Sequence, residues 1–513
     1  MTKLWLIYKT VAKETDKTEK KNNMGKQNNN VKDEKFDTRE AVKEIADINA
    51  DFPAWYTDVV IKTKLVDYGP IKGTMVIRPY GYAIWENIQR EMNNRFKATG
   101  HENAYFPLLI PYSFFLKEAE HVEGFAPEVA IVTHAGGEEL AEKLVIRPTS
   151  ETIICHMYSK WVQSYRDLPL LINQWANIVR WEKTTRPFLR TSEFLWQEGH
   201  TLHANAQEAI DETILILNLY EEFCKNVLAM PVIAGKKTQK EKFAGAIDTY
   251  SIEAMMQDGK SLQSGTTHYF GTRFTEAFDI KFQDVDKTHK YAYESSWGTS
   301  TRLIGALIMA HGDARGLCLP PKVAPIQAVI IPIATHKPGV TEAAASIKMQ
   351  LEKAGVRVKL DDSDERPGWK FNEYELKGVP LRIELGPKDL ENGVATLSRR
   401  DKAGEKFVVS LDEMGEKTPL LLGDIHENMY QKALLFMQSR TETVYDMEGL
   451  RAAMEGGKFA LAMWCGEVGC EDKVKAELSA TSRNMPFDQT PVGDKCVCCG
   501  GKAKRKIFFA KAY

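Results

Sequence analysis

The stretch Ile178–Glu182 reads IVRWE, and after the polar segment Lys183–Arg186 the chain continues with Arg190–Phe194, which reads RTSEF. The outer stretches alternate in polarity and the segment between them has the composition of a turn, which predicts an antiparallel hairpin. Side chains two positions apart on a strand point to the same face, so Arg180 and Glu182 are expected to share one space. The sequence therefore predicts a hairpin that presents a basic and an acidic group together.

An arginine beside a glutamate has two explanations. A guanidinium next to a carboxylate suits a ligand with both an anionic group and a hydrogen-bond donor, such as a nucleotide phosphate beside an amino acid. An ion pair across two exposed strands is common and contributes little to stability. The hairpin alone does not separate the two explanations.

Two further segments carry strong patterns. The region Pro79–Gly100 predicts an amphipathic helix closed by glycine, followed by a strand over Ala104–Pro111. Arg302 follows a Thr-Ser-Thr sequence and opens an apolar helix that includes Leu303–Ile308. The apolar face of the first helix consists of Ile84, Trp85, Ile88, Met92 and Phe96.

In their order along the chain, the helix and strand, the hairpin and the Arg302 helix resemble the three signature motifs of class II aminoacyl-tRNA synthetases. Shorter strings are similar to prolyl-tRNA synthetases of the archaeal/eukaryotic type: RPTSE at 147–151, WQEGH at 196–200 and SWG at 296–298. The likeness extends from about Phe52 to Tyr513. A threonyl enzyme, as another class II synthetase, and a non-catalytic paralogue that only binds tRNA remain the alternatives.

The resemblance implies an α+β fold in several parts. We expect a disordered tail at 1–38, an antiparallel-sheet catalytic domain at 39–322, an α/β anticodon-binding domain at 323–423 and a small zinc-binding α/β domain at 424–513. The tail is expected to be disordered because residues 9–35 are rich in Lys and Asn and poor in large apolar residues. Translation from Met1 and from Met24 both stay open. In the third part the pattern itself predicts strands at 328–332, 356–360 and 381–385, helices at 341–354 and 369–376, and a later helix at 424–439.

Composition limits the classes of function. The 513 residues allow several domains, and the 68 Lys and Arg residues nearly balance the 70 Asp and Glu residues. Net charge says little about tRNA binding, because phosphate recognition depends on local basic patches. No run of eighteen apolar residues and no secretory signal is found, so we expect a cytoplasmic protein without a membrane span.

By resemblance, Arg180 and Arg302 are the catalytic residues. Arg180 would hold the α-phosphate of ATP and the proline carboxylate, and Arg302 would cover the adenine ring opposite Phe194. Glu182 would meet the adenine amino group, and Arg190 the outer phosphates. The full set expected to bind ATP with Mg²⁺ is Arg180, Glu182, Arg190, Thr191, Phe194, Gln263, Thr266, Ser300 and Arg302.

The same resemblance selects a proline pocket. Thr149 and Glu151 would anchor the ammonium group. The spacing of His200 and His203 could suggest a metal, but no third ligand lies nearby in the sequence, so His203 is interpreted as structural. Cys155, Cys224 and Cys318 form no Cys and His set of the kind that threonyl enzymes use to hold zinc, which speaks against threonine. The expected substrate residues are Thr149, Glu151, Arg180, Trp196, Glu198, His200, Phe243 and His268.

Two sites are expected beyond the catalytic domain. By resemblance, Glu375, Arg382 and Lys388 read the two guanines of the proline anticodon. Five of the eight cysteines lie between Cys465 and Cys499, which favours metal ligation over disulfides. The resemblance selects Cys465, Cys470, Cys496 and Cys498 for a structural zinc ion, and spacing also permits Cys499 in place of Cys498.

The partners expected from the resemblance are L-proline, tRNA with a proline anticodon and a second copy of the chain. About a hundred residues separate His200 from Arg302, and family-like strings occupy them. We therefore expect no editing domain inserted between the second and third motifs.

Overall fold

The computed structural model describes residues 45–114, 129–402 and 404–513, all of which fall in a single unit of the chain. The tail expected at 1–38 lies outside the described residues. Among the described residues, no helix has both the length and the apolar character needed to cross a bilayer.

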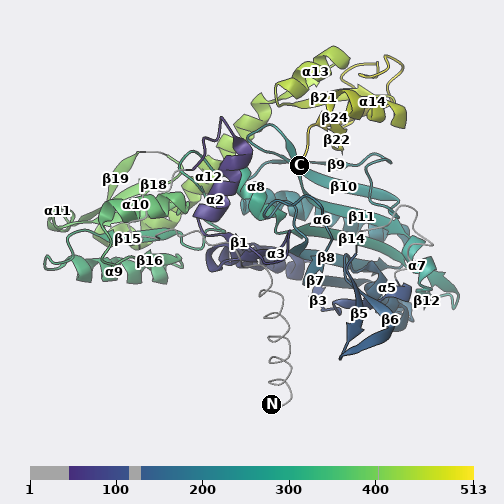
Figure 1. The fold of residues 1–513 in the computed structure, drawn as a ribbon, viewed down its shortest axis with the longest axis horizontal. Coiled ribbons are helices and arrows are strands. Elements are labelled where there is room, and N and C mark those ends of the chain that lie inside the picture. The colour runs from purple at the N-terminus through teal and green to yellow at the C-terminus, as the bar shows by residue number, and fades with distance from the viewer. Residues whose placement is uncertain (1–44, 115–128, 403) are drawn as a thin grey trace, which may run out of the picture. The chain divides into compact units, whose positions relative to one another are not determined.

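An eight-stranded sheet forms the centre of the fold, in the order β23-β9-β10-β11-β14-β8-β7-β3 (Figure 1). All neighbouring strands are antiparallel except β3 and β7, which are parallel. This confirms the predicted antiparallel sheet. The strands are β3 (Glu102–Asn103), β7 (Leu170–Val179), β8 (Glu193–His203), β9 (Val232–Lys236), β10 (Asp248–Met255), β11 (Ser261–Gly271), β14 (Tyr293–Ser300) and β23 (Met485–Pro486).

Helices α3 (Pro79–Ala98), α6 (Ala206–Asn226) and α8 (Arg302–His311) share one hydrophobic core with the sheet. The predicted apolar face of α3 is confirmed, since all five of its residues are at most 3% exposed. Phe96 of α3 packs on Trp297 of β14 with ring centroids 4.8 Å apart. The periodicity of α3 therefore predicts correctly which face meets the sheet. The other elements of this region are α2 (Phe52–Lys62), β1 (Val66–Tyr68), β2 (Met75–Ile77), α5 (Glu151–Trp161), α7 (Arg273–Ala277), β12 (Lys281–Gln283) and β13 (His289–Tyr291).

The strand predicted at 104–111 is wrong in extent. Only β4 (Leu109–Pro111) pairs there, in a separate three-stranded sheet with β5 (Ile131–Ala135) and β6 (Glu138–Ile146). The backbone of Phe106 bonds to side chains instead: its N–H donates to Gln174 Oε1 at 2.6 Å, and its carbonyl accepts from Arg147 Nη1 at 2.7 Å. These bonds use the groups that a strand ladder would need.

A five-stranded sheet follows, in the order β16-β15-β17-β18-β19. The predicted strands at 328–332 and 381–385 are confirmed as β15 and β17, and the predicted helices agree within two residues at each end. Strand β16 is shorter than predicted. The bounds are β15 (Ala328–Pro332), α9 (Val340–Lys353), β16 (Val358–Leu360), α10 (Pro367–Leu376), β17 (Leu381–Leu385), α11 (Pro387–Glu391), β18 (Val394–Arg399) and β19 (Lys406–Ser410).

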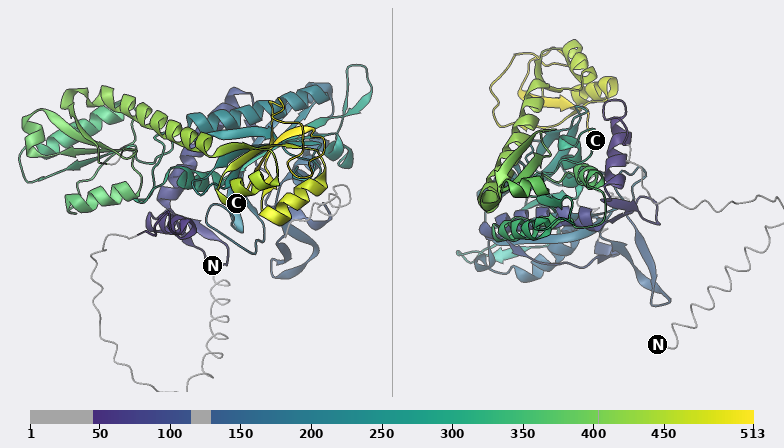
Figure 2. Two further views of the ribbon diagram at one scale, coloured as in Figure 1. Left: turned by 90° about the horizontal axis from the view of Figure 1, so that it is seen from above. Right: turned by 90° about the vertical axis from the view of Figure 1, so that its left-hand side faces the viewer.

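The long helix α12 (Met414–Ser439) leads from this sheet to the last one (Figure 2). It begins at Met414 rather than at 424, so the boundary expected at 423/424 falls inside a continuous helix. The last sheet has the order β20-β21-β24-β22. Its elements are β20 (Thr441–Val444), α13 (Met447–Glu455), β21 (Phe459–Trp464), α14 (Val468–Leu478), β22 (Thr481–Ser482) and β24 (Arg505–Ala510).

The C-terminal part also supplies the edge of the central sheet. Strand β23 pairs with β9 through Met485 and Pro486. Beside it, Arg483 Nη2 lies 2.9 Å from Glu253 Oε2, and both side chains are buried. The C-terminal part is thus built into the central sheet by backbone pairing and by a buried ion pair.

We predict that Gly199→Ala destabilises the fold. Gly199 of β8 lies opposite Trp297 of β14, and a Cβ at Gly199 would overlap the indole ring. Forcing extra volume into a packed core costs about 1 to 3 kcal/mol. Circular dichroism during denaturant unfolding should show an earlier transition.

The matched control is Gly423→Ala on α12, where an added Cβ meets nothing within 4 Å. Alanine in a helix interior is more stable than glycine by about 0.5 to 1 kcal/mol, so this variant should unfold no earlier than wild type. Equal behaviour of the two variants would contradict the packing argument.

Candidate active site and cysteine cluster

A cavity of about 300 Å³ opens on the face of the central sheet formed by β8, β11 and β14. The size suits a small-molecule ligand. It brings together most of the residues selected from the sequence, although they come from segments far apart in the chain. These are Thr149, Glu151, Arg180, Phe194, Trp196, Glu198, His200, Phe243, Gln263, Thr266, His268, Ser300 and Arg302.

The hairpin at the cavity edge has a longer connection than predicted. Strand β7 ends at Val179 and β8 begins at Glu193, so Arg180 and Glu182 lie beyond the strand rather than on it. The N–H of Arg180 still donates to Ser192 O at 2.8 Å, which closes the base of the connection. The hairpin is confirmed, and the extent of its strands is corrected.

Arg180 is held in a fixed orientation. Its Nε donates to Pro148 O at 3.1 Å, and its guanidinium lies 5.7 Å from the Phe194 ring and 5.8 Å from the Trp196 ring. Burial lowers the pKa of Arg180, which Glu151 opposes, and arginine stays charged. A held, charged guanidinium is suited to an anionic ligand.

Arg302 is the first residue of α8 and gives the cavity a second guanidinium. Its Nε donates to Leu189 O at 3.2 Å, and its N–H donates to Ser300 Oγ at 3.2 Å. Burial and the charge of Arg180 both lower the pKa of Arg302. Two arginines that lower each other's affinity for a proton in one cavity are suited to an anion such as a phosphate.

Three expected ATP-binding residues do not line the cavity. Glu182 pairs with Arg190 at 3.1 Å between Oε2 and Nε, and both lie on the connection between the strands. The Arg190 side chain is 62% exposed, so this pair is held loosely. Thr191 donates from Oγ1 to Glu193 O at 2.7 Å.

Two buried carboxylates also line the cavity. Thr149 Oγ1 donates to the carboxylate of Glu151. Glu198 Oε1 accepts from Ser150 Oγ and, at 2.8 Å, from Gln174 Nε2. Burial raises the pKa of Glu151, whereas the charge of His200 lowers it. These carboxylates are suited to a cationic group such as an ammonium.

The two histidines of the cavity differ in charge. Burial lowers the pKa of His200, but hydrogen bonds to Glu198 and Glu294 raise it, and the result is about 10. Burial lowers the pKa of His268 to about 3, and the nearby His200 adds to this. His268 is therefore neutral, and its ring packs on Phe243 at 4.8 Å between centroids.

Several lining residues were missed from the sequence. Ser296 and Gly298 alternate with Ser300 along β14, so the period of two would have selected them once Ser300 was fixed. Glu241 lies on the connection before Phe243, and no motif or periodic pattern in the sequence pointed to it. The missed lining residues are Glu241, Thr249, Ser264, Gly265, Ser296, Trp297, Gly298 and Thr299.

The remaining predictions for this region agree with the structure. His203 is buried outside the cavity lining and meets Thr201 Oγ1 at 2.9 Å, which supports a structural role. Cys155, Cys224 and Cys318 are buried, and each is a thiol rather than half of a disulfide.

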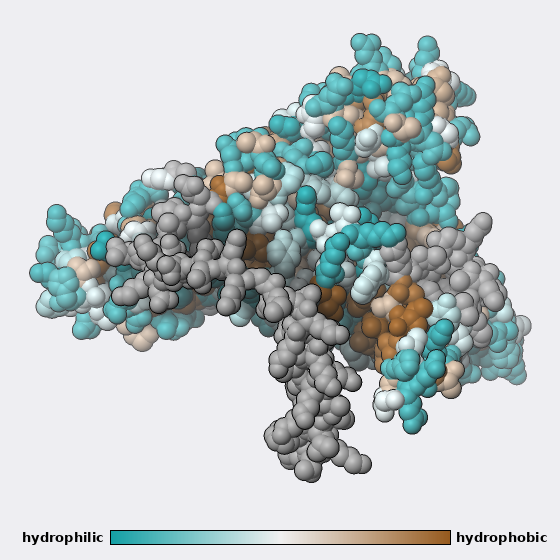
Figure 3. Space-filling view, in the orientation of Figure 1, coloured by the Kyte–Doolittle hydropathy of each residue, from teal (hydrophilic) through white to brown (hydrophobic). Residues whose placement is uncertain are grey.

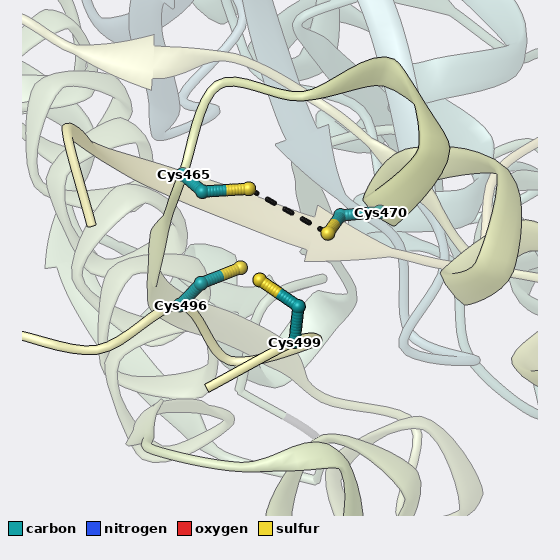
Figure 4. A group of neighbouring side chains, drawn as sticks. All are labelled: Cys465, Cys470, Cys496 and Cys499. Atoms are coloured by element: carbon teal, nitrogen blue, oxygen red, sulfur yellow. Dashed lines mark hydrogen bonds between the residues drawn. The ribbon is translucent and has the colours of Figure 1, made fainter. Parts of the chain in front are cut away.

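Four thiols gather in the last part of the chain: those of Cys465, Cys470, Cys496 and Cys499, with all sulfur atoms within 4.8 Å of one another (Figure 4). Cys465 follows β21, Cys470 lies on α14, and the other two lie before β24. A tetrahedral zinc ion with bonds of about 2.3 Å holds its sulfur atoms about 3.8 Å apart, which this group fits.

The fourth thiol differs from the one that the resemblance selected. Cys499, not Cys498, joins the group. Gly500 has φ +70° and donates its N–H to Cys496 O at 2.9 Å, so the chain turns back on itself there. The turn brings the third residue after Cys496 to the same side as Cys496, and Cys498 falls outside the four.

The expected anticodon residues lie on different elements of the five-stranded region. Glu375 is on α10 and pairs with Arg315, and Lys388 is on α11. Arg382 on β17 donates from Nε to Glu384 Oε1 at 3.1 Å and covers the Phe371 ring at 4.3 Å. The structure gives no direct contact among the three within its described residues.

Family models match three successive segments of the chain. Residues 132–311 match the tRNA synthetase class II core domain (G, H, P, S and T), residues 327–418 the anticodon binding domain, and residues 447–513 the prolyl-tRNA synthetase C-terminal domain. The first segment contains most strands of the eight-stranded sheet, the second contains the five-stranded sheet, and the third contains most of the four-stranded sheet.

Curated relatives cover nearly the whole chain. Proline--tRNA ligase 2 of a Bacillus cereus strain is 56% identical over 93% of this chain and 100% of its own length. Proline--tRNA ligase of Alkaliphilus oremlandii is 58% identical over 93% of this chain and 99% of its own length.

A solved structure of prolyl-tRNA synthetase from Cryptosporidium parvum, complexed with halofuginone and AMPPNP, is 40% identical with a TM-score of 0.88. The match covers 92% of this chain and 100% of that one. Together with the cavity and its two arginines, these similarities show that the chain belongs to the prolyl-tRNA synthetase family of class II aminoacyl-tRNA synthetases.

Proposed function

We propose that this chain ligates L-proline to tRNA in two ATP-dependent steps. The observation that carries the proposal is the set of charges that line one cavity, in which the guanidinium groups of Arg180 and Arg302 occur together with the carboxylates of Glu151 and Glu198. A zwitterionic amino acid bound beside a phosphate needs both kinds of charge.

In the first step the proline carboxylate attacks the α-phosphorus of ATP. A bond forms between a carboxylate oxygen and phosphorus, and the bond to pyrophosphate breaks. A carboxylate is already a nucleophile at neutral pH, so no general base is required. Arg180 stabilises the charge that develops at the α-phosphate, and Arg302 positions the nucleotide over its adenine ring. ATP would bind as its Mg²⁺ complex, with Gln263 beside the ion.

In the second step the terminal ribose hydroxyl of tRNA attacks the mixed anhydride. AMP leaves, the proton of the hydroxyl passes to the leaving phosphate, and proline stays esterified to the tRNA. The α-phosphate lies beside Arg180 in both steps, so this residue serves both.

The proposed ATP contacts keep the assignments made from the sequence. Phe194 and Arg302 cover the adenine, while Thr191, Thr266 and Ser300 supply further contacts. Glu182 and Arg190 need only release their exposed ion pair to face the nucleotide, because such pairs are weak.

For proline, Thr149 and Glu151 anchor the ammonium group. Trp196, Glu198, His200, Phe243 and His268 complete the pocket. The Nε1 of Trp196 is buried without a hydrogen-bond partner in the described part of the chain, which supports a ligand acceptor at that wall.

For tRNA, we propose that residues 323–423 bind the anticodon, with Glu375, Arg382 and Lys388 reading its guanines. Arginine and lysine match guanine O6 and N7, and glutamate accepts from N1 and N2. Residues 39–322 form the catalytic domain and 424–513 the C-terminal domain.

The four-thiol group is proposed to hold a structural zinc ion. Four protein ligands leave no open coordination position, so the ion has no catalytic role. Cys465, Cys470, Cys496 and Cys499 are the ligands that the geometry favours.

We also propose a homodimer in the cytoplasm. Apolar side chains gather beside the β5–β6 hairpin (Figure 3), and Leu109 of β4 and Ile131 of β5 are each 44% exposed. Tyr68 and Val76 of the β1–β2 hairpin are also more than half exposed. A second copy is the partner that would cover them.

The central test is amino-acid-dependent exchange of pyrophosphate into ATP. Proline should be the best substrate, and Arg180→Ala should abolish exchange, since losing a preorganised charge costs about 3 kcal/mol or more in the transition state. Exchange that prefers threonine would indicate the threonyl alternative, and no exchange at all a non-catalytic paralogue.

Arg382→Ala is the matched control for this test. It should keep proline-dependent exchange and lose tRNA charging, because Arg382 lies on β17 of the five-stranded sheet and does not line the cavity. Loss of both reactions would point to misfolding or to a wrong anticodon assignment.

The zinc proposal predicts different results for neighbouring cysteines. Protein purified without chelators should contain one zinc ion per chain by elemental analysis, and Cys499→Ser should lose it because binding is coupled to all four thiols. Cys498→Ser should retain zinc. Loss of zinc from Cys498→Ser with zinc retained in Cys499→Ser would show that Cys498 is the fourth ligand. Wild-type protein without zinc would show that the proposed site does not exist.

The chain is proposed to lack an editing domain between His200 and Arg302. Alanine is smaller than proline, so the pocket discriminates only by lost contact, about 1 to 3 kcal/mol per methylene. We expect some alanyl adenylate and no hydrolysis of Ala-tRNA that carries the proline anticodon. Incubation of the enzyme with preformed Ala-tRNA tests this, and hydrolysis above the enzyme-free rate would contradict it.

A further inference from the structure

The His200 ring lies between two buried carboxylates. Its Nε2 is 3.3 Å from Glu198 Oε2, and its Nδ1 is 3.4 Å from Glu294 Oε1. The side chains of His200, Glu198 and Glu294 are 2%, 2% and 0% exposed, so water does not replace these contacts. Glu198 and His200 line the cavity, whereas Glu294 lies behind the lining.

Both ring nitrogens therefore face acceptors. Glu198 already accepts at Oε1 from Ser150 and Gln174, as an ionised carboxylate does. Glu294 also accepts from the thiol of Cys155, with the sulfur 3.8 Å from each oxygen, but thiols donate weakly. A neutral imidazole has one N–H and would leave one carboxylate facing a lone pair. An imidazolium has two N–H groups and can donate one to each carboxylate.

We propose that Glu294 is a positioning residue of the active site, which holds His200 as a fixed imidazolium in the wall of the proline pocket. This rests on the proposal that the cavity binds proline. Glu294 acts through His200 and touches no substrate. Its role is to fix the ring orientation and to set the charge of His200.

The charges around His200 come from four elements. Glu198 is on β8 and Glu294 on β14, while Glu151, Cys155 and Tyr158 project from α5 and His268 from β11. The guanidinium of Arg180 also acts on Glu151 and Glu198. Three carboxylates, one imidazolium and one guanidinium leave an excess of one negative charge when all are ionised, and that excess attracts the ammonium group of proline.

The sign of the pH dependence follows from the raised pKa of His200. The folded-state pKa is about 10, so the imidazolium and the stability it contributes persist at neutral pH and are lost only as the pH rises through that value. In Glu294→Gln one stabilising carboxylate is gone, and the pKa of His200 should fall into the range from about 6 to 9.

The experiment compares KM for proline in pyrophosphate exchange between pH 6 and 9. Wild type should show no His200 titration in this range. In Glu294→Gln the surroundings of His200 have one negative charge fewer at pH 6, so KM for proline should rise about tenfold there and fall as His200 loses its proton. KM for ATP should change little, since the proposed nucleotide contacts do not include His200.

Glu212→Gln is the matched control. Glu212 is another buried carboxylate that faces a histidine, with Oε1 2.8 Å from His101 Nε2, but neither residue lines the cavity. This variant should keep the wild-type KM for proline at every pH. If KM for proline rose as much in Glu212→Gln as in Glu294→Gln, the rise would reflect a general loss of stability, and the inference would be wrong.

A second measurement does not depend on activity. In protein labelled with ¹⁵N-histidine, the His200 signals, assigned by their absence in His200→Asn, should be those of an imidazolium in wild type at pH 7 and should titrate below pH 9 in Glu294→Gln. A neutral His200 in wild type would overturn the inference. Wild type that fails to exchange with proline would instead overturn the proposed function.

Discussion

The pairing of β8 with both β7 and β14 is the constraint on which the active site depends. Through it, residues of the hairpin at 170–203 meet residues near 300 on one face of a single sheet. Ser300 lies opposite Trp196 and Ser296 opposite His200, so the register alone decides which side chains share the cavity. A shift by one residue would turn all of them to the other face. Gly199, which leaves space for Trp297, shows how closely the ladder and the core beneath it are matched.

The cavity gathers charges of both signs. Arg180 and Arg302 line it together with Glu151, Glu198 and His200, and the two carboxylates oppose the effect of burial on the pKa of Arg180. Buried charges are costly unless they are paired, and here each one has partners from at least one other element. The Glu198–His200–Glu294 arrangement is the most buried example, because two strands and α5 enclose it. Ligand binding and fold stability therefore use the same residues.

The C-terminal part is joined to the catalytic sheet more closely than its place at the chain end suggests. Glu253 of β10 accepts from Lys237 Nζ at 2.8 Å and from Arg483 at 2.9 Å, with all three side chains buried. Glu253 is opposite Gln263, which lines the cavity. The C-terminal part thus stabilises the strand pair that carries the proposed nucleotide contacts. Its four thiols come from the segment after β21, from α14 and from the loop before β24.

Local periodicity in the sequence determined the buried face of α3, the hairpin and strands β15 and β17. Each of these patterns repeats within a few residues, and apolar side chains of each element pack in a hydrophobic core. The motifs also selected most of the cavity lining. Only the tertiary structure decided the rest. Long-range side-chain bonds at Phe106 shortened the predicted strand, and the extent of the 180–192 connection followed from contacts with Gly73 and Pro148. The sequence left Cys498 and Cys499 both open, and the turn at Gly500 brings the sulfur of Cys499 to the other three. No sequence motif pointed to Glu294, because its proposed role depends on the His200 ring, which contacts it from the neighbouring strand β8.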